Sequence, residues 1–433
     1  MSAAIQDLVF SGLPRRYASR NDVGFMNITF EQFKQLAKKH THIPLYQTLP
    51  ADLDSPLSAF IKLGGADYAF LFESVVGGEK WARFSFIGTN PKKIYQVDDK
   101  KLIITADGKS ETHDFKRTPL EVLQKEFLEI EAYQDPGLPR FFGGIVGYLG
   151  YDLVQYFSGI SFTKKKADDF PESILMMTDS VVIFDSLKQV MMLVNTIEVP
   201  KGASDDGLQK IYDESLGKID SLKSLLTQSM QTPQPHAPIG SLKVTPSDSE
   251  ADFCQKVITA KEYIKAGDIF QVVLSMRFTL DTENIDALHV YRSLRRVNPS
   301  PYMYFLRLKD IAIVGSSPEV LVRLEDDKIE VRPIAGTRKR GDTEEKDKEL
   351  ENELRNDPKE RAEHLMLVDL GRNDIGKVAE VGSVVVEENE VIERYSHVMH
   401  LVSHVSGKIA ADKDVFDAIE ATFPAGTLSG APK

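Results

Sequence analysis

The sequence has little cysteine and no surplus of positive charge. Cys254 is the single cysteine among 433 residues, so no disulfide can form within the chain, and a reducing compartment suits it best. Aspartate and glutamate outnumber lysine and arginine by 65 to 53, which gives a formal net charge of −12. A nucleic-acid-binding surface needs clustered basic residues, so this balance argues against a nucleic-acid partner.

Long apolar runs are also missing. No stretch approaches the roughly 20 apolar residues that a membrane-spanning helix needs, so we expect no membrane partner. The N-terminus carries Arg15, Arg16 and Arg20, but it also carries Asp7 and has no long apolar core. A secretory signal is therefore not expected. A cytoplasmic location fits, while import into a plastid or mitochondrion stays open.

The composition that is present, 42% hydrophobic and 27% charged, is typical of a globular protein. A chain of this length exceeds one ordinary core, so two large units are expected. Three prolines within residues 232–238 form the clearest linker. We therefore place a first region at 27–200, a helix and Pro-rich linker at 201–246, and a second region at 247–433.

Residue periodicity predicts clusters of strands interrupted by helices. Residues 68–74 and 83–88 have the aromatic and alternating pattern of two paired strands, and residues 208–226 have the spacing of a helix. After the linker, residues 269–280 alternate as one strand. Because strands and helices do not alternate strictly, the pattern favours an α+β fold over a doubly wound one.

One stretch, residues 357–374, combines a helix start with a pair of acids. Asp357 is a candidate N-cap, and Pro358 suits the first helical position. Glu360 and Glu363 are three residues apart and so share a helix face. The helix then turns apolar, which indicates that it enters a core. Two carboxylates at the mouth of a buried helix need a positive partner, and we predict a metal ion.

Four more short stretches contain residues that often act in active sites. An acid follows a tight turn in 315–319, a turn of small residues ends a strand in 333–338, two histidines lie in 397–400, and a glycine-rich turn lies in 426–433. Each alone is more often structural than functional. The glycine-rich stretch 142–152 lacks the order of a dinucleotide-binding loop and has no Walker lysine, so we interpret it as close backbone packing.

Together and in this order, the motifs resemble those of the chorismate-utilising enzymes, and among these the anthranilate synthase component I group. In the first half the resemblance rests on Leu-Phe-Glu-Ser (71–74) and Gly-Gly-Ile-Val-Gly-Tyr (143–148). In the second half it rests on residues 268–273, 298–303, 315–319, 333–337, 362–374, 400–403 and 423–433. The resemblance implies the fold of that family, with mixed β-sheets packed as a sandwich and surrounded by helices.

The resemblance also implies an enzyme, a lyase of tryptophan biosynthesis. Such an enzyme aminates chorismate at C2 with loss of the C4 hydroxyl, and then eliminates pyruvate to give anthranilate. Cys254 has the setting of a helix interior, whereas a glutaminase nucleophile stands at a sharp turn. We therefore expect ammonia to come from a separate glutamine amidotransferase subunit or from solution.

The resemblance assigns roles to acids and a histidine. Glu319 matches the family's general acid for the leaving hydroxyl, a role that requires a raised pKa. Glu363 matches the family's Mg²⁺ ligand, and Glu360 is expected to hold a metal-bound water. His400 matches the active-site histidine that assists proton removal at C2, while we expect its neighbour His397 to be structural.

The resemblance further assigns substrate contacts and the subclass. Gly336, Thr337 and Thr427 match contacts to the substrate carboxylates. Gln271 stands where isochorismate and salicylate synthases carry a lysine that activates water, and a neutral amide cannot act as that base. Ala335 stands where most aminodeoxychorismate synthases carry a proposed lysine nucleophile. Both replacements favour direct attack by ammonia.

In the family, tryptophan inhibits by binding to the first half. Glu73 and Ser74 match that motif, together with Pro301, Tyr302 and Met303 from the second half. An acid and a hydroxyl suit an α-ammonium group, and a proline-aromatic turn suits an indole. The other interpretation is that residues 70–73 simply form a sheet strand, and the two interpretations are compatible.

Family members continue for several dozen residues beyond the position of Lys433, and that part supplies the second magnesium carboxylate. We therefore expect residues 1–433 alone to be unable to convert chorismate. Two alternatives stay open. One is component I of aminodeoxychorismate synthase, and the other is a truncated, non-catalytic form that binds tryptophan or the glutaminase subunit.

Overall fold

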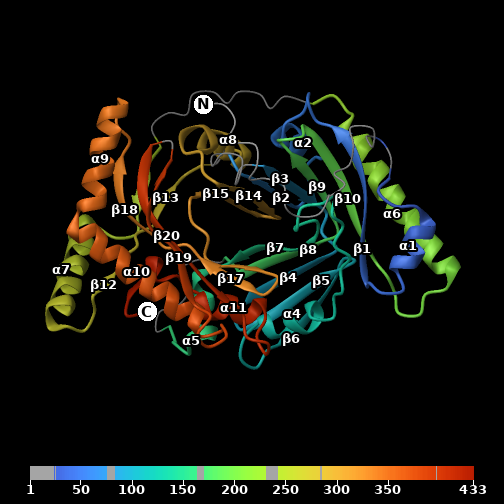
Figure 1. The fold of residues 1–433 in the computed structure, drawn as a ribbon. Coiled ribbons are helices and arrows are strands. Elements are labelled where there is room, and N and C mark those ends of the chain that lie inside the picture. The colour runs from blue at the N-terminus through green and yellow to red at the C-terminus, as the bar shows by residue number, and fades with distance from the viewer. Residues whose placement is uncertain are drawn as a thin grey trace, which may run out of the picture.

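The computed structural model combines antiparallel β-sheets with helices packed on their outer faces (Figure 1), which confirms the predicted α+β class. Part of the predicted Pro-rich linker lies outside the described residues. Within the described parts of the chain, no helix has the length and apolar character needed to cross a membrane. The structure describes residues 24, 26–75, 83–162, 170–230, 242–282, 285–395 and 397–433.

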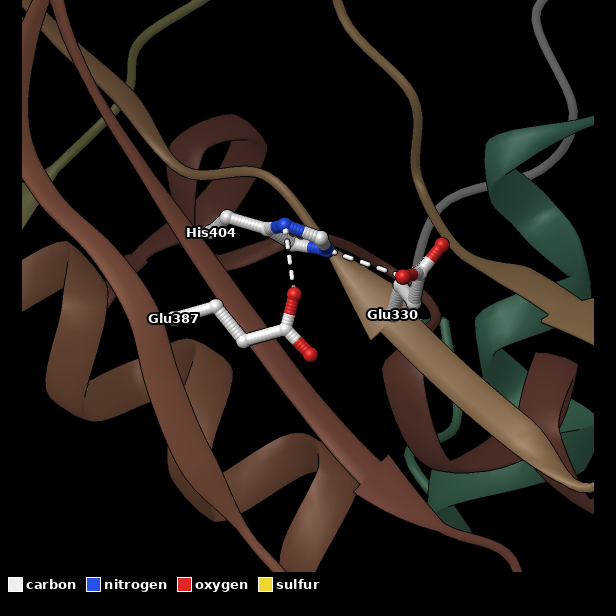
Figure 2. Close-up of side chains that lie close together, drawn as sticks. All are labelled: Glu330, Glu387 and His404. Atoms are coloured by element: carbon white, nitrogen blue, oxygen red, sulfur yellow. Dashed lines mark ion pairs between the residues drawn. The ribbon is translucent and has the colours of Figure 1, made fainter. Parts of the chain in front are cut away.

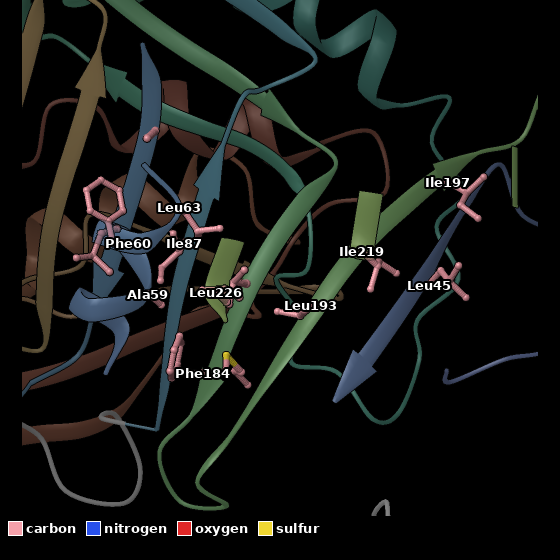
Figure 3. Close-up of a cluster of buried hydrophobic side chains, with 14 of the residues drawn as sticks. Leu45, Ala59, Phe60, Leu63, Ile87, Phe184, Leu193, Ile197, Ile219 and Leu226 are labelled. Atoms are coloured by element: carbon pink, nitrogen blue, oxygen red, sulfur yellow. The ribbon is translucent and has the colours of Figure 1, made fainter. Parts of the chain in front are cut away.

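The largest sheet has seven strands in the order β1-β10-β9-β3-β2-β14-β15. Helices cover one of its faces, and their apolar side chains form the largest buried cluster with those of the sheet (Figure 3). The strands are β1 (His42–Pro50), β2 (Tyr68–Glu73), β3 (Phe84–Thr89), β9 (Ser180–Asp185), β10 (Val190–Glu198), β14 (Tyr302–Leu308) and β15 (Ile311–Ser317). The helices are α1 (Phe30–Leu36), α2 (Pro56–Lys62), α6 (Asp205–Leu226) and α8 (Ala287–Val297).

Strands β14 and β15 come from the far side of the predicted region boundary. β14 pairs with β2, with Met303 opposite Glu73 and Leu308 opposite Tyr68, and β15 pairs with β14. One sheet therefore contains strands from residues 27–200 and from residues 247–433. The division at 201–246 stays a prediction, but the two regions share hydrogen bonds and a core.

A second sheet of five strands lies against the first, in the order β6-β5-β4-β8-β7. Phe70, Ile183 and Leu306 of the first sheet pack with Val146 and Met176 of the second, which makes the predicted sandwich. The strands are β4 (Lys93–Asp98), β5 (Lys101–Ala106), β6 (Lys109–Asp114), β7 (Gly144–Leu149) and β8 (Ser173–Thr178). A further buried cluster joins this sheet to side chains from α4 (Leu120–Phe127), the 3-10 turn η2 (Tyr151–Leu153), α5 (Val154–Ser158) and α11 (Val415–Thr422).

The glycines of the 142–152 stretch permit close packing, as interpreted from the sequence. Gly147 lies in β7 so near to β8 that a Cβ atom there would come 2.1 Å from the Ile174 carbonyl oxygen. Any side chain at Gly147 would push the two strands apart.

The third sheet carries the predicted site motifs. Its strands run in the order β16-β17-β20-β18, with β19 also paired to β20, and α9 and α10 lie beside it (Figure 1). Its elements are β16 (Arg323–Glu325), β17 (Lys328–Val331), β18 (Ile334–Lys339), β19 (Val385–Arg394), β20 (Val398–Lys408), α9 (Glu344–Asn356) and α10 (Pro358–Gly376).

The single strand predicted over residues 269–280 is wrong. The structure has β12 (Gln271–Val272) and β13 (Phe278–Leu280) there, separated by irregular chain. β12 pairs with β21 (Gly430–Ala431), and β13 pairs with β11 (Val244–Pro246). Residues 269–280 do alternate in sequence, but the two ends of this stretch pair with two different strands. The neighbouring helices are α7 (Glu250–Ala266) and α12 (Gly426–Ser429).

Candidate active site

Helix α10 organises the site. As predicted, Asp357 caps it, because its side chain accepts hydrogen bonds from the backbone N–H groups of Lys359 at 2.9 Å and Glu360 at 3.2 Å, and Pro358 occupies the first turn. His364 and Leu367 are buried against the third sheet. The apolar part of the helix begins at Leu365, but this side chain is 59% exposed, because the helical period turns it away from the face that packs on the sheet. One side of α10 therefore faces the sheet.

Four predicted site residues meet beside the first turn of α10. Gly336 forms a bulge in β18 with φ of +68°, and a Cβ atom there would lie 3.2 Å from Glu360 Oε2. Thr337 is paired with His400 across β18 and β20, and His400 Nδ1 lies 3.0 Å from Thr337 Oγ1 and 3.1 Å from the Gly336 carbonyl oxygen. A carbonyl only accepts, so this geometry places a proton on Nδ1 and leaves Nε2 to accept one.

The positive partner of Glu360 within the chain is an arginine that the sequence reasoning missed. Arg338 donates to Glu360 Oε1 at 3.3 Å, to Asp357 Oδ2 at 2.8 Å and to Glu353 Oε1 at 2.8 Å. The carboxylate of Glu360 is thus held by an arginine and is not by itself a reason to invoke a metal. Arg338 directly follows the Gly-Thr turn, but its pairing depends on how α9 and α10 pack on β18.

Glu363 lies one turn further along α10 and meets Gln271 of β12. Gln271 Nε2 donates to Glu363 Oε1 at 3.2 Å. Gln271 Oε1 is buried and has no hydrogen-bond partner in the described parts of the chain. The unpartnered amide oxygen and the adjacent carboxylate together offer hard oxygen ligands, which are the ligands that Mg²⁺ prefers. The residues present therefore fit the predicted ion.

Glu319 lies toward the other end of α10. It follows β15 and lines a cavity of about 40 Å³ with Leu367 and Asp374 of the helix and with Thr427 of α12. Thr427 Oγ1 donates to Glu319 Oε1 at 3.4 Å. Burial raises the pKa of Glu319 to about 6, while the hydrogen bond from Thr427 partly opposes this rise. The side chain thus has the raised pKa that its predicted role as an acid requires.

The raised pKa of Glu319 predicts a measurable effect on stability. The difference between about 6 and the ordinary 4.5 corresponds to about 2 kcal/mol. Because the folded chain binds this proton more tightly, the contribution of Glu319 to stability is present at pH 4 and is lost as the pH rises through 6. We therefore expect Glu319→Gln to match the wild type at pH 4 and to be about 2 kcal/mol more stable at pH 7.5.

Urea unfolding of both proteins across this pH range measures the effect. Glu349→Gln, on the exposed surface of α9, is the control and should follow the wild type throughout. A constant difference between Glu319→Gln and wild type at all pH values would contradict the raised pKa.

The end of α10 is fixed by a buried acid, Asp374. Lys377 Nζ donates to Asp374 Oδ1 at 2.9 Å, and Lys433 Nζ donates to Asp374 Oδ2 at 2.8 Å. Lys433 Nζ also donates to the Thr422 carbonyl oxygen at 2.9 Å. These bonds tie α10 to the end of α11, directly before the turn that carries Thr427.

The five residues predicted to bind tryptophan line one cavity of about 1060 Å³. They come from β2 and its continuation, Glu73 and Ser74, and from the start of β14, Pro301, Tyr302 and Met303. Ser74 Oγ is buried there without a hydrogen-bond partner in the described residues. The structure thus brings the two sequence motifs together, although they are more than 200 residues apart.

Glu73 has partners that sequence reasoning missed. Arg295 of α8 donates from Nε to Glu73 Oε2 at 3.0 Å and from Nη2 to Oε1 at 3.1 Å, and Tyr291 donates to Oε2 at 2.6 Å. Burial, followed by the neighbouring Glu73 charge, raises the pKa of Tyr291 well above its ordinary value. No signal within the α8 sequence indicates this contact, because it depends on α8 lying next to β2.

A separate cluster on the third sheet has the residue types of a metal site. Glu330, Glu387 and His404 come from β17, β19 and β20 (Figure 2). His404 Nε2 faces Glu330 at 3.0 Å, whereas Nδ1 faces Glu387 at 3.2 Å. Lys328 Nζ lies 2.6 Å from Glu330 and 2.8 Å from Glu387. Because the two carboxylates face opposite ring nitrogens and already hold a lysine, we interpret the cluster as an ion-pair network.

Comparisons with known proteins agree with the motifs. The family described as chorismate binding enzyme matches residues 70–433. The chain is 42% identical over 411 residues to anthranilate synthase component 1 of Acetivibrio thermocellus, covering 94% of this chain and 82% of that protein. It is 43% identical over 413 residues to the protein of the same name from Aquifex aeolicus, with the same coverage of 94% and 82%.

Solved structures resemble the fold. Anthranilate synthase component I from Streptococcus pneumoniae superposes with a TM-score of 0.67 at 32% identity, over 89% of this chain and 81% of that one. The menaquinone-specific isochorismate synthase MenF of Escherichia coli superposes with a TM-score of 0.62 at 15% identity, over 93% and 80% of the two chains. At that identity the second likeness concerns the fold alone. The fold expected from the motifs is confirmed.

Proposed function

The chain belongs to the family of chorismate binding enzymes, and from this membership we propose that it is the large component of an anthranilate synthase. In this proposal it converts chorismate and ammonia into anthranilate and pyruvate, the first step of tryptophan biosynthesis. One observation carries the proposal beyond family membership. A single helix, α10, lies next to the Gly336 bulge near its start, meets Gln271 through Glu363, and lines the cavity of Glu319 and Thr427 toward its end.

The acid–base groups suit the loss of a hydroxyl followed by aromatisation. Glu319, with its pKa near 6, retains a protonated fraction near neutral pH and donates that proton to the departing C4 hydroxyl. Thr427 orients the carboxyl through its hydrogen bond. His400, whose Nδ1 is fixed by the Gly336 carbonyl, presents Nε2 as the acceptor of the C2 proton. Backbone and hydroxyl groups of Gly336 and Thr337 receive a substrate carboxylate.

Mg²⁺ belongs to the proposal because of the donors beside α10. Glu363 would hold the ion directly, the Gln271 amide oxygen lies next to it, and Glu360 would act through an ordered water. When bound, the ion supplies a positive charge that receives a substrate carboxylate. Glu363 and Gln271 would fix the position of the ion beside α10.

The nucleophile in this proposal is ammonia. Gln271 and the buried Ala335 provide neither a base for water nor a lysine nucleophile. The ammonia would come from a glutamine amidotransferase subunit, in keeping with the name component 1 of the bacterial relatives. Tryptophan is proposed as the feedback ligand of the cavity lined by Glu73, Ser74 and the start of β14.

Chorismate binding tests the proposal, because binding does not depend on turnover. Calorimetry is expected to show binding in millimolar Mg²⁺ and strong weakening when the ion is chelated. Any product that does form after ammonium is added identifies the reaction, with anthranilate supporting the proposal and 4-amino-4-deoxychorismate favouring the runner-up, aminodeoxychorismate synthase. Absence of chorismate binding in the presence of Mg²⁺ would contradict both enzymes and leave the non-catalytic alternative.

A further inference from the structure

Arg338 lies near the end of β18, next to the first turn of α10, and three carboxylates surround it. Its Nη1 donates to Glu360 Oε1 at 3.3 Å and to the Thr337 carbonyl oxygen at 2.9 Å. Its Nη2 donates to Asp357 Oδ2 at 2.8 Å, and its Nε donates to Glu353 Oε1 at 2.8 Å. These bonds engage all three nitrogens of the guanidinium, so the group is fixed in position.

Glu360 depends on Arg338 more than the other two acids do. Asp357 also accepts hydrogen bonds from the backbone N–H groups that it caps, and Glu353 is 59% exposed, so water screens its charge. Glu360 is only 20% exposed, and Arg338 is its one ion-pair partner among the described residues. The guanidinium is therefore chiefly the counter-charge of Glu360.

The two oxygens of Glu360 face different groups. Oε1 accepts the hydrogen bond from Arg338, whereas Oε2 accepts none from the described parts of the chain and lies toward Gly336. A Cβ atom at Gly336 would come 3.2 Å from Oε2, so the absence of a side chain there keeps space beside this oxygen. Oε2 can therefore accept a hydrogen bond from a water molecule while Arg338 holds Oε1.

Glu363 has no such counter-charge. It lies one turn further along α10, and its hydrogen-bond partner is the neutral amide of Gln271, with Nε2 at 3.2 Å from Oε1. Within the part of the chain that the structure describes, Glu363 makes no ion pair. A dication that approaches the two acids therefore meets an uncompensated carboxylate at Glu363. At Glu360 it meets a guanidinium, which repels it and already occupies one oxygen.

We propose that Arg338 keeps Glu360 out of direct contact with the ion, so that Glu363 binds the ion directly and Glu360 binds it only through a water molecule. To reach the ion with its own oxygens, Glu360 would have to give up its charge-assisted bond to Arg338. Such a contact would also take a coordination position that a substrate carboxylate needs. Arg338 is thus a positioning residue, and the inference rests on the proposed function and its ion.

Removing the guanidinium is expected to change ion binding and chorismate binding in opposite directions. In Arg338→Met, Glu360 is free to bind the ion directly, and calorimetry should show about tenfold tighter binding of Mg²⁺ alone than in wild type. Chorismate at saturating Mg²⁺ should bind about tenfold more weakly, because the added ligand takes the position of a substrate carboxylate. A purely structural role of Arg338 would weaken both.

Mn²⁺ in place of Mg²⁺ allows the bound water molecules to be counted. Electron paramagnetic resonance of Mn²⁺ in isotopically labelled water should show about one bound water fewer in Arg338→Met than in wild type. Arg338→Lys keeps a cation beside Glu360 and should restore the wild-type count and both affinities. Glu353→Gln is the matched control, because it removes an exposed partner of Arg338 and leaves the bond to Glu360, so it should behave like wild type.

Two further measurements show whether the effect passes through Glu360. Adding Glu360→Gln to Arg338→Met should abolish the gain in affinity for Mg²⁺, because the gain comes from the Glu360 carboxylate. Glu360→Gln alone should keep the wild-type number of water molecules on Mn²⁺, since Glu360 is not a direct ligand while Arg338 is present. This second measurement does not require Arg338→Met to fold.

The outcomes separate the role of Arg338 from the function on which it rests. A wild-type protein that binds neither Mg²⁺ nor chorismate would overturn the proposed function and the role of Arg338 together. If wild type binds both, weaker or unchanged Mg²⁺ binding in folded Arg338→Met would overturn the role of Arg338 alone. An additional water on Mn²⁺ in Glu360→Gln would do the same. Melting temperatures establish whether Arg338→Met is folded, and Glu360→Gln decides the question if it is not.

Discussion

Replacing Glu363 by alanine is expected to weaken Mg²⁺-dependent chorismate binding by more than about 100-fold. Loss of a residue that only orients a ligand costs 10- to 100-fold in metal affinity, so loss of the direct carboxylate should cost more. Glu363 meets the unpartnered Gln271 amide oxygen at the proposed ion site, and neither Gln271 nor the arginine-bound Glu360 supplies a free carboxylate in its place. Calorimetric titration with chorismate at fixed Mg²⁺, and with Mg²⁺ alone, measures both affinities.

Two variants on the same helix make the result specific. Asp369→Ala removes an α10 carboxylate that is 67% exposed and pairs only with Arg372 among the described residues, so it should bind chorismate like wild type. Glu360→Gln keeps the shape of a residue expected to act through water, and it should lose less affinity than Glu363→Ala. Equal losses in Glu360→Gln and Glu363→Ala, or no loss in Glu363→Ala, would refute the unequal roles of the two acids.

Replacing Phe305 by alanine is expected to destabilise the chain by about 3–5 kcal/mol. Phe305 lies in β14, is 1% exposed, and packs edge-on against Phe60 of α2 and Tyr291 of α8, with ring centroids 5.4 and 5.9 Å apart. Its removal leaves a cavity at the place where the two regions of the chain share one sheet. The loss should therefore reach the first region, although the substitution is in the second.

Urea unfolding followed by two probes tests this expectation. Hydrogen exchange of the β1 and β10 amide groups, read by mass spectrometry, reports on the first region, and far-ultraviolet circular dichroism reports on the whole chain. Both transitions should move to lower urea in Phe305→Ala. Phe278→Ala, at a phenylalanine that is 54% exposed in β13, should shift neither. A transition of the β1 and β10 amides that stays in place while the dichroism shifts would show that the two regions unfold independently.

The elements that the sequence predicted well are those governed by local chemistry. The cap of α10 by Asp357 and the helix predicted over 208–226, observed as α6 (Asp205–Leu226), follow from side-chain oxygens and apolar spacing within a few residues. The α+β class followed from the order of such elements. The strand over 269–280 failed because its division depends on two distant partners, β11 and β21.

Motifs predicted the candidate site residues, but they did not predict the partners of those residues. Glu360 proved to be bonded to Arg338, Glu363 to Gln271, and Glu73 to Arg295 and Tyr291. The Gln271–Glu363 contact spans 92 residues and the Glu73–Arg295 contact 222 residues. Which residues meet across such separations is set by sheet order and by the packing of helices on sheets, and single-segment patterns contain neither.

The sequence by itself determined that α10 begins at a capped, acid-bearing turn, and that the site motifs follow one another in the order of a chorismate-utilising enzyme. Those properties reside in neighbouring residues and in their succession along the chain. Only the tertiary structure decided that Glu319 is buried enough to raise its pKa, that α10 lies next to both Gly336 and Glu319, and that β14 joins the cavity lined by Ser74 and Tyr302 to the strand before Glu319. Burial and cross-strand pairing arise when distant segments pack, and this packing sets the chemistry of each side chain.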